Sequence, residues 1–351
     1  MKICLLATWS DSLTYTMARA LAFSGHPVQV WIADVERDRQ STWSLSGRIA
    51  AIPGASVIAD HAAPPPAPFD QLIVQGHSQL LRYRNVLDQL APHARHLTLV
   101  SLGDRSRPWR QALRMQWREW RWMGRWFGKV NRIVYKDGFH RLDWLGLLRS
   151  RRVVGFDAHS NFLRDDTLFQ AIHAADWTAD APRPHRANFL GSRDPAIRER
   201  ILESVERYFS AAPNGAPGPS MLWHAYSDAQ PAALSPAEFL RALTESDFTL
   251  APPGYSLLTH RPVEALLRGS IPVLNADELD LYDLGLANGV NCIAVPPGGW
   301  PGAMARIVAM GEPEVVAMRR NVVAMLDDQV AYPALARAIC RRLGVVEASA
   351  A

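Results

Sequence analysis

Short apolar runs alternate with amphipathic stretches along most of the chain. The first run, "KICLLAT" (2–8), has the length and composition of a buried strand. It is followed by "DSLTYTMARALAFSG" (11–25), a helical pattern with Asp11 or Ser12 as its cap and Gly25 after its end. Strands that alternate with helices in this way predict βαβ units around a parallel sheet. Further strands of this first series are predicted at 26–34, 55–60, 70–76, 96–103, 131–137 and 151–157, with a helix at 78–90.

A second series of the same kind follows a candidate linker, "TADAPRPHRA" (178–187), which contains residues that break regular structure. Its first helix is predicted at 194–209, with Asp194 as the cap and Pro195 at the first helical position. The two series predict an α/β fold of two doubly wound, Rossmann-like domains in tandem, with an interdomain cleft. The predicted boundaries are 1–180 for the N-terminal domain, 187–330 for the C-terminal domain and 331–351 for a final helix and tail. The other elements of the second series are strands at 187–192, 220–226 and 291–296, with helices over 300–346.

The composition agrees with a folded, soluble protein. The chain has 351 residues, of which 48% are hydrophobic and 21% charged, enough for two domains with their own cores. Its three cysteines, Cys4, Cys292 and Cys340, lack metal-ligand spacing and are too few for a disulfide framework, which favours a reducing compartment. The N-terminus is too short in apolar residues for a signal peptide, and no run is long enough to span a membrane. A cytoplasmic location is therefore expected.

Residues 105–152 concentrate arginine and tryptophan. They hold fourteen Lys and Arg against three acids, and six of the chain's 12 tryptophans. Many of the cations fall on one stripe of a predicted helix, and tryptophan beside arginine is typical of a membrane interface with anionic headgroups. The segment is thus predicted to bind the inner face of a membrane peripherally, or to hold an anionic lipid-linked substrate. The residues proposed for this surface are Arg110, Arg114, Arg118, Arg121, Arg125, Trp117, Trp122 and Trp126. An alternative is a solvated cationic face whose tryptophans pack against the first domain; nucleic-acid binding is not expected, because no recognition module accompanies the segment.

The stretch "SDFTLAPPGYSLLTHRPVEALLRGSIPVL" (246–274) contains the main candidate site. It predicts two strands joined by a loop and a helix from Pro262 to Arg268, with Arg261 as its cap and Gly269 as its stop. A guanidinium beside a helix start suits phosphate oxygens, and Glu264 can accept hydrogen bonds from vicinal ribose hydroxyls. Together they predict a nucleotide-diphosphate pocket at the carboxyl end of a strand. The alternative is that Glu264 only caps its helix and pairs with Arg261.

The same stretch resembles the signature of the exostosin-type glycosyltransferases, an S-x-F-x-L-x-P-x-G run followed by R-x-x-E-A and G-x-I-P-V. The residues in register are Ser246, Phe248, Leu250, Pro252, Gly254, Arg261, Glu264, Ala265, Gly269, Pro272 and Val273, and upstream "FLGSRDPAIRERI" adds Phe189, Gly191 and Arg198. The resemblance covers 187–282 and implies a two-domain GT-B fold and an inverting, metal-independent transfer from a nucleotide-diphosphate sugar. It also implies that Arg261 and Glu264 contact the phosphates and ribose of the donor. Thr249 and Ser270 depart from the family, in which many members have cysteine at these positions.

These observations define the expected chemistry. Positive charge in the loop and at the helix start would stabilise the departing nucleoside diphosphate without a metal or a cofactor. The acid-rich runs "RDD" (164–166) and "DELD" (277–280) lack the setting of a metal site. The predicted donor-binding residues are Arg261, Glu264, Gly254, Tyr255, Ser256, His260, Arg198 and His224. Inversion needs a base that takes the proton of the acceptor hydroxyl, and the candidates are Asp11 and His77, each after a strand of the first domain, with Asp104 as a third. Asp11 as a helix cap and His77 as a structural histidine remain the alternatives.

The expected function is a glycosyltransferase that moves a sugar from a UDP- or GDP-sugar to a glycan or lipid-linked acceptor in the assembly of surface polysaccharide. Two other functions stay open on the same scaffold. One is a nucleotide-sugar epimerase or hydrolase, and the other is a non-catalytic, membrane-associated binding module.

Overall fold

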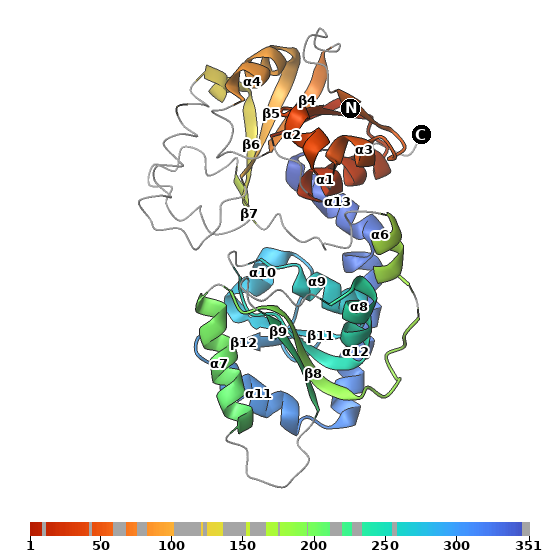
Figure 1. The fold of residues 1–351 in the computed structure, drawn as a ribbon, viewed down its shortest axis with the longest axis vertical. Coiled ribbons are helices and arrows are strands. Elements are labelled where there is room, and N and C mark those ends of the chain that lie inside the picture. The colour runs from red at the N-terminus through yellow and green to blue at the C-terminus, as the bar shows by residue number, and fades with distance from the viewer. Residues whose placement is uncertain are drawn as a thin grey trace. The chain divides into compact units, whose positions relative to one another are not determined.

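The computed structural model folds into two compact units, Met1–Phe156 with Tyr332–Ala351 and Asp157–Ala331 (Figure 1). It describes residues 1–8, 12–41, 44–58, 68–75, 83–101, 121, 125–135, 152–154, 166–174, 176–194, 196–210, 220–226, 234–254 and 258–345.

The first unit contains a seven-stranded sheet in the order β3-β2-β1-β4-β5-β6-β7, and every pair of neighbours is parallel. Its elements are β1 (Ile3–Ala7), α1 (Ser12–Phe23), β2 (Val28–Ile32), α2 (Val35–Gln40), α3 (Leu45–Ile49), β3 (Ala55–Ile58), β4 (Phe69–Gln75), α4 (Arg84–Leu90), β5 (Ala94–Ser101), β6 (Val130–Tyr135), β7 (Arg152–Val154) and α13 (Tyr332–Leu343). All five residues of β1 are buried, as expected for a central strand covered on both faces. The predicted strands of this series are confirmed to within a few residues.

The strand order of the first sheet reverses between β1 and β4, the position where open α/β sheets bind ligands. The Thr8 hydroxyl, just after β1, donates to the backbone carbonyl of Gln75 at the end of β4 at 2.7 Å. Asp11 and His77 follow these two strand ends in the sequence, and both lie outside the described residues.

The last helix, α13, packs against α1 and belongs to the first unit. Its backbone carbonyls accept hydrogen bonds from the first sheet. Thr98 Oγ1 donates to Leu343 O at 3.0 Å, and Arg132 Nη1 donates to Arg341 O at 2.8 Å. The structure therefore divides the chain differently from the sequence prediction, with a boundary at Phe156 and a C-terminal helix that returns to the first core. A hydrophobic pattern locates the ends of a helix, but it does not show which core the helix covers.

The second unit contains a five-stranded parallel sheet in the order β12-β11-β10-β8-β9. Its elements are α6 (Asp166–Ile172), β8 (His185–Ser192), α7 (Ala196–Ser210), β9 (Met221–Tyr226), α8 (Pro236–Thr244), β10 (Ser246–Leu250), α9 (Arg261–Leu267), β11 (Ile271–Asn275), α10 (Leu279–Tyr282), β12 (Ile293–Val295), α11 (Trp300–Ala309), α12 (Glu312–Met325) and a π-helical turn (Leu326–Val330). The strand order reverses between β8 and β10. This sheet is thus doubly wound as predicted, and its reversal point lies beside the Ser246–Leu274 stretch.

The turn from α9 into β11 is stabilised by backbone and side-chain hydrogen bonds. Gly269 has φ 68°, and the amides of Gly269 and Ser270 donate to Leu266 O and Ala265 O, both at 2.9 Å. These two bonds form a Schellman motif, which confirms the predicted stop at Gly269. The buried hydroxyls of Thr249 and Ser270 lie 2.7 Å apart, so a hydrogen bond joins β10 to this turn at the positions where the family often has cysteine.

The three cysteines are all buried thiols that form no disulfide. Among the described residues, no helix combines the length and the apolar character that a bilayer crossing requires.

Candidate functional site

A polar cavity of about 180 Å³ lies at the carboxyl ends of β8 and β10, at the reversal point of the second sheet. It is lined by Phe189, Leu190, Gly191, Ser192, Arg198, Tyr226, Leu250, Ala251, Pro252, Thr259, His260, Arg261 and Glu264. Four predicted donor-binding residues, Arg198, His260, Arg261 and Glu264, are therefore brought to one place although they span 67 positions of the sequence. We call this cavity the switch-point pocket.

Arg261 is held in the switch-point pocket by three neighbours. Its guanidinium lies 3.2 Å from Glu264 Oε2, donates to the backbone carbonyl of Leu190 at the end of β8, and stacks 4.5 Å above the ring of Phe239. The side chain is 20% exposed, so it keeps a limited surface for a ligand. Burial lowers the pKa of Arg261, while Glu264 and Tyr226 raise it. An arginine remains charged under these conditions, and the contacts fix the direction in which it can donate.

The start of α9 differs from the prediction by one residue. The helix begins at Arg261, its N-cap is His260, and Pro262 occupies the second helical position. The predicted cap at Arg261 was therefore wrong. The first amides of a helix have no partner within it, so proline is tolerated throughout the first turn and does not mark its first residue uniquely.

Arg198 on α7 is the second guanidinium of the switch-point pocket. Its Nη1 donates to the carbonyls of Ser192 and Asp194, both at 3.0 Å, and its Nε donates to Pro253 O at 3.3 Å. These bonds join the loop after β8 to the loop after β10. A Cβ on Gly254 would contact the guanidinium of Arg198, so the backbone at this position approaches that side chain closely.

The remaining predicted donor residues have separate outcomes. Tyr255 and Ser256 lie outside the described residues. His224 on β9 is not among the residues that line the pocket; its ring lies 6.3 Å from that of Tyr226, which does line it.

Sequence reasoning missed two contributors, Tyr226 and Phe239. Phe239 lies on α8, a helix that was not predicted. Its signal is present in the sequence as Ser235 followed by Glu238, and the structure shows the reciprocal capping box that this spacing favours. The stacking of Phe239 on Arg261 has no local signal, because the two residues lie on different elements.

The described end of the Arg–Trp segment is attached to the first unit. Trp126 packs against the core of that unit and donates from Nε1 to Asp88 Oδ1 at 3.0 Å. Lys129 donates to three backbone carbonyls between α4 and the start of β5, those of Ala91 and Ala94 at 2.9 Å and that of Pro92 at 3.0 Å. Trp126 therefore agrees with the alternative prediction, in which the tryptophans pack against the first domain.

Arg125 is 61% exposed and pairs with Asp88, and Arg121 is exposed. The other proposed surface residues, Arg110, Arg114, Arg118, Trp117 and Trp122, lie outside the described residues.

The chain is similar to one protein-family model and to several solved structures. Residues 167–281 match the family model of the RXYLT1 C-terminal domain. Among solved structures, the chain is similar to HepE from Anabaena in complex with UDP, with 12% identity and a TM-score of 0.56 over 98% of this chain and 100% of that one. It is also similar to the trehalose-6-phosphate phosphatase N-terminal domain from Candida albicans, with 11% identity and a TM-score of 0.55 over 98% and 96%. Sucrose-phosphate synthase from Thermosynechococcus elongatus gives 10% identity and a TM-score of 0.52 over 97% and 98%. No curated protein matches the chain.

Two Rossmann-like units with these structural relatives define a GT-B glycosyltransferase fold, as the sequence predicted. The match at residues 167–281 lies in the second unit and overlaps the stretch of the sequence that resembles the exostosin-type glycosyltransferases.

Proposed function

We propose that the protein transfers a sugar from a nucleotide-diphosphate donor to a glycan or lipid-linked acceptor, with inversion at the sugar carbon and without a metal ion. The observation that carries this proposal is the switch-point pocket. Two guanidiniums and one buried carboxylate meet there, at the strand ends where this type of sheet binds its ligands.

The charges of the pocket favour a diphosphate. Arg198 and Arg261 outweigh the single carboxylate of Glu264, so the pocket is net positive. Arg198 is fixed by three backbone carbonyls, and Arg261 by Leu190 O and Phe239. Hydrogen-bond donors that are held in place before the reaction stabilise developing negative charge on the phosphates without having to reorganise. In this arrangement Glu264 accepts hydrogen bonds from the ribose hydroxyls while it orients Arg261.

UDP is the nucleotide we propose for the donor. HepE, which shares the fold, has been solved with UDP and with UDP-glucose. The small switch-point pocket suits the polar diphosphate and ribose. Tyr226 at its edge offers an aromatic ring and a hydroxyl to the rest of the nucleotide.

The chemistry follows from these positions. As the bond from the sugar to the diphosphate breaks, negative charge grows on the phosphate oxygens, and the two guanidiniums neutralise it. A base must take the proton from the acceptor hydroxyl that attacks the opposite face of the sugar. We propose Asp11 or His77 for this role. They follow β1 and β4, where the order of the first sheet reverses.

A thermal-shift screen followed by product analysis tests the function. UDP-glucose, UDP-N-acetylglucosamine and GDP-mannose are compared with UDP alone, with and without EDTA. A true donor at 100 times its Kd should stabilise the protein by about 2.7 kcal/mol, a shift of several degrees. We expect a UDP-sugar to give this shift and to release UDP in the presence of a generic acceptor, with EDTA present.

The three possible functions give different results in this assay. Release of free sugar or an isomerised nucleotide sugar without an acceptor would favour the hydrolase or epimerase. Binding without any turnover would favour the binding module, and loss of activity in EDTA would contradict the metal-free mechanism.

We further propose that the Arg–Trp segment binds the protein peripherally to an anionic membrane on its cytoplasmic face. The proposal is supported by the cationic stripe of the sequence and by the exposure of Arg121 and Arg125. It would place the enzyme near a lipid-linked acceptor of surface polysaccharide assembly.

Liposome flotation tests the membrane proposal. Reversal of four arginines to glutamate should release the protein from phosphatidylserine vesicles, because each cation near an anionic surface contributes about 1 kcal/mol. A control with the same change of net charge reverses four exposed arginines of the second unit and should still float. Equal flotation of both variants would contradict the proposal. The test positions are Arg114, Arg118, Arg121 and Arg125, and the control positions are Arg200, Arg207, Arg241 and Arg306.

A further inference from the structure

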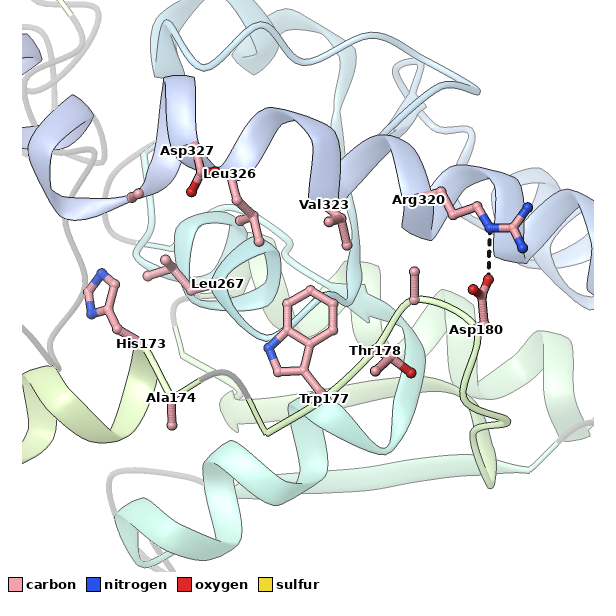
Figure 2. A pocket seen from close by; sticks show the side chains of 12 residues that line it. His173, Ala174, Trp177, Thr178, Asp180, Leu267, Arg320, Val323, Leu326 and Asp327 are labelled. Carbon is pink, nitrogen blue, oxygen red and sulfur yellow. Dashed lines mark hydrogen bonds and ion pairs between the residues drawn. The ribbon is translucent and has the colours of Figure 1, made fainter.

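The second unit has another cavity, of about 580 Å³, which shares no residue with the switch-point pocket (Figure 2). Arg261 and Glu264 lie in the first turn of α9, whereas Leu267, which lines the second cavity, is its last residue. The two ends of this helix are separated by about 9 Å along the axis. We call the second cavity the strap cavity, because residues 173–174 and 177–180 form one of its walls.

Trp177 forms the centre of that wall. A Cβ on Gly269 would overlap the indole, so the ring lies directly against the backbone of the α9–β11 turn. An ion pair holds the segment on either side of the ring. Asp176 pairs with Arg268 at 2.5 Å, and Asp180 pairs with Arg320 at 2.8 Å. The packing of the indole on this turn positions the aromatic surface before any ligand arrives, which favours specific binding.

Apolar side chains lie opposite Trp177. Figure 2 shows Leu267 of α9, Val323 of α12 and Leu326 of the π-helical turn on the other side of the cavity from the tryptophan. Val323 is 43% exposed, so part of this apolar surface is accessible to a ligand. An apolar slot with one aromatic wall fits a ligand that presents two flat, non-polar faces.

Polar groups lie around the edge of this slot. The hydroxyl of Thr178 and the Asp180–Arg320 ion pair are on one side, and Asp327 is on the other (Figure 2). A purely hydrocarbon ligand would leave these groups without hydrogen-bond partners when it displaced their water, which costs free energy. A ligand with hydroxyls around its edge would replace that water.

The charge of the cavity selects against anions. Two carboxylates, Asp180 and Asp327, line it with one guanidinium, Arg320, which is already paired. A phosphate or a uronic acid would meet net negative charge, in contrast to the switch-point pocket.

We propose that the strap cavity binds an uncharged carbohydrate, with the C–H face of one ring stacked on Trp177 and its hydroxyls bonded to the edge residues. The volume is in the range of small-molecule sites and exceeds what a single pyranose needs, so a segment of two sugars is the expected occupant. As far as the sugar belongs to an acceptor glycan, this inference rests on the proposed function. The cavity would then hold the glycan away from the donor.

Ligand-observed saturation-transfer NMR tests the site with named probes. The probes are maltose, cellobiose, lactose and N,N′-diacetylchitobiose, with 1-octanol and UDP as chemically different ligands. We expect at least one disaccharide to give a transfer signal with the parent protein. Val323→Trp fills the cavity from an exposed helix position and should abolish that signal.

Val290→Trp provides the matched control. Val290 is 45% exposed, lies in the same unit and does not line the cavity. This variant should retain the disaccharide signal. Trp177→Phe keeps an aromatic wall and should weaken the signal without abolishing it, and the conservative change limits the risk of unfolding.

Several outcomes would overturn the proposal. They are absence of a signal from all four disaccharides, equal signals from the Val323→Trp and parent proteins, and binding of 1-octanol alone. The variant Arg261→Ala separates this inference from the proposed function. It should weaken UDP binding, as measured by calorimetry, and keep the disaccharide signal, so failure of one site does not imply failure of the other.

Discussion

Replacing Arg261 by alanine is expected to weaken UDP binding by about 100-fold, or about 2.8 kcal/mol. The change removes a cation that faces the switch-point pocket. It also leaves the carboxylate of Glu264, which is only 4% exposed, without the guanidinium 3.2 Å away. Truncating one partner of a buried, hydrogen-bonded charge pair at a binding site typically costs 2–5 kcal/mol, and both consequences act in the same direction. Isothermal titration calorimetry with UDP measures the effect directly.

Two variants show whether the loss comes from the position of the charge. Arg261→Lys keeps a cation but loses the planar fork that reaches Glu264 and Leu190 O together, so its affinity should lie between those of the parent and the alanine variant. Arg200→Ala removes an exposed arginine of α7 and should leave the affinity unchanged. An Arg261→Ala protein that binds UDP as tightly as the Arg200→Ala control would remove the donor-site assignment.

The strands were predictable because each parallel sheet is covered on both faces. A buried strand such as β1 is then a continuous apolar run, and the loops around it contain glycine, proline or polar residues. The candidate site within the Ser246–Leu274 stretch was predictable for a different reason. Arg261 and Glu264 lie three residues apart, so one local motif brings both to the same turn of α9. Local sequence determines such pairs directly.

Contacts between distant segments were not predictable in the same way. Phe239 stacks on Arg261 from a helix 22 positions earlier, and α13 covers the first sheet although it ends the chain. The Arg–Trp segment illustrates the same difficulty, because periodicity gives the face of a helix but not its partner. Trp126 packs on a core, whereas Arg125 nearby is exposed. Apolar surface is buried wherever the tertiary structure offers it, and one sequence does not specify that place.

Buried ion pairs anchor β10, the strand that leads to the switch-point pocket. At the amino end of β10, Asp247 is 3% exposed and pairs with Arg186 at 3.1 Å and with Arg319 at 3.2 Å. Burial raises the pKa of Asp247, and the two arginines lower it. Arg319 is fully buried and also binds Glu312 at 3.1 Å and Ala181 O at 2.9 Å. It therefore ties α12 and the segment before β8 to the strand that leads to the switch-point pocket.

Arg319→Met should destabilise the second unit by about 3–5 kcal/mol, because it leaves the buried Asp247 with only one of its two cations. The neighbouring Arg320 gives a matched control on the same helix. Its side chain is 65% exposed and pairs with an equally exposed Asp180, so Arg320→Met should cost less than about 1 kcal/mol. Urea titration compares the two variants, and hydrogen exchange of a peptide that covers β10 locates the effect, since two units need not unfold together. Similar midpoints and similar exchange for both variants would show that the buried charges do not hold β10 in place, because burial is the main difference between these adjacent arginines.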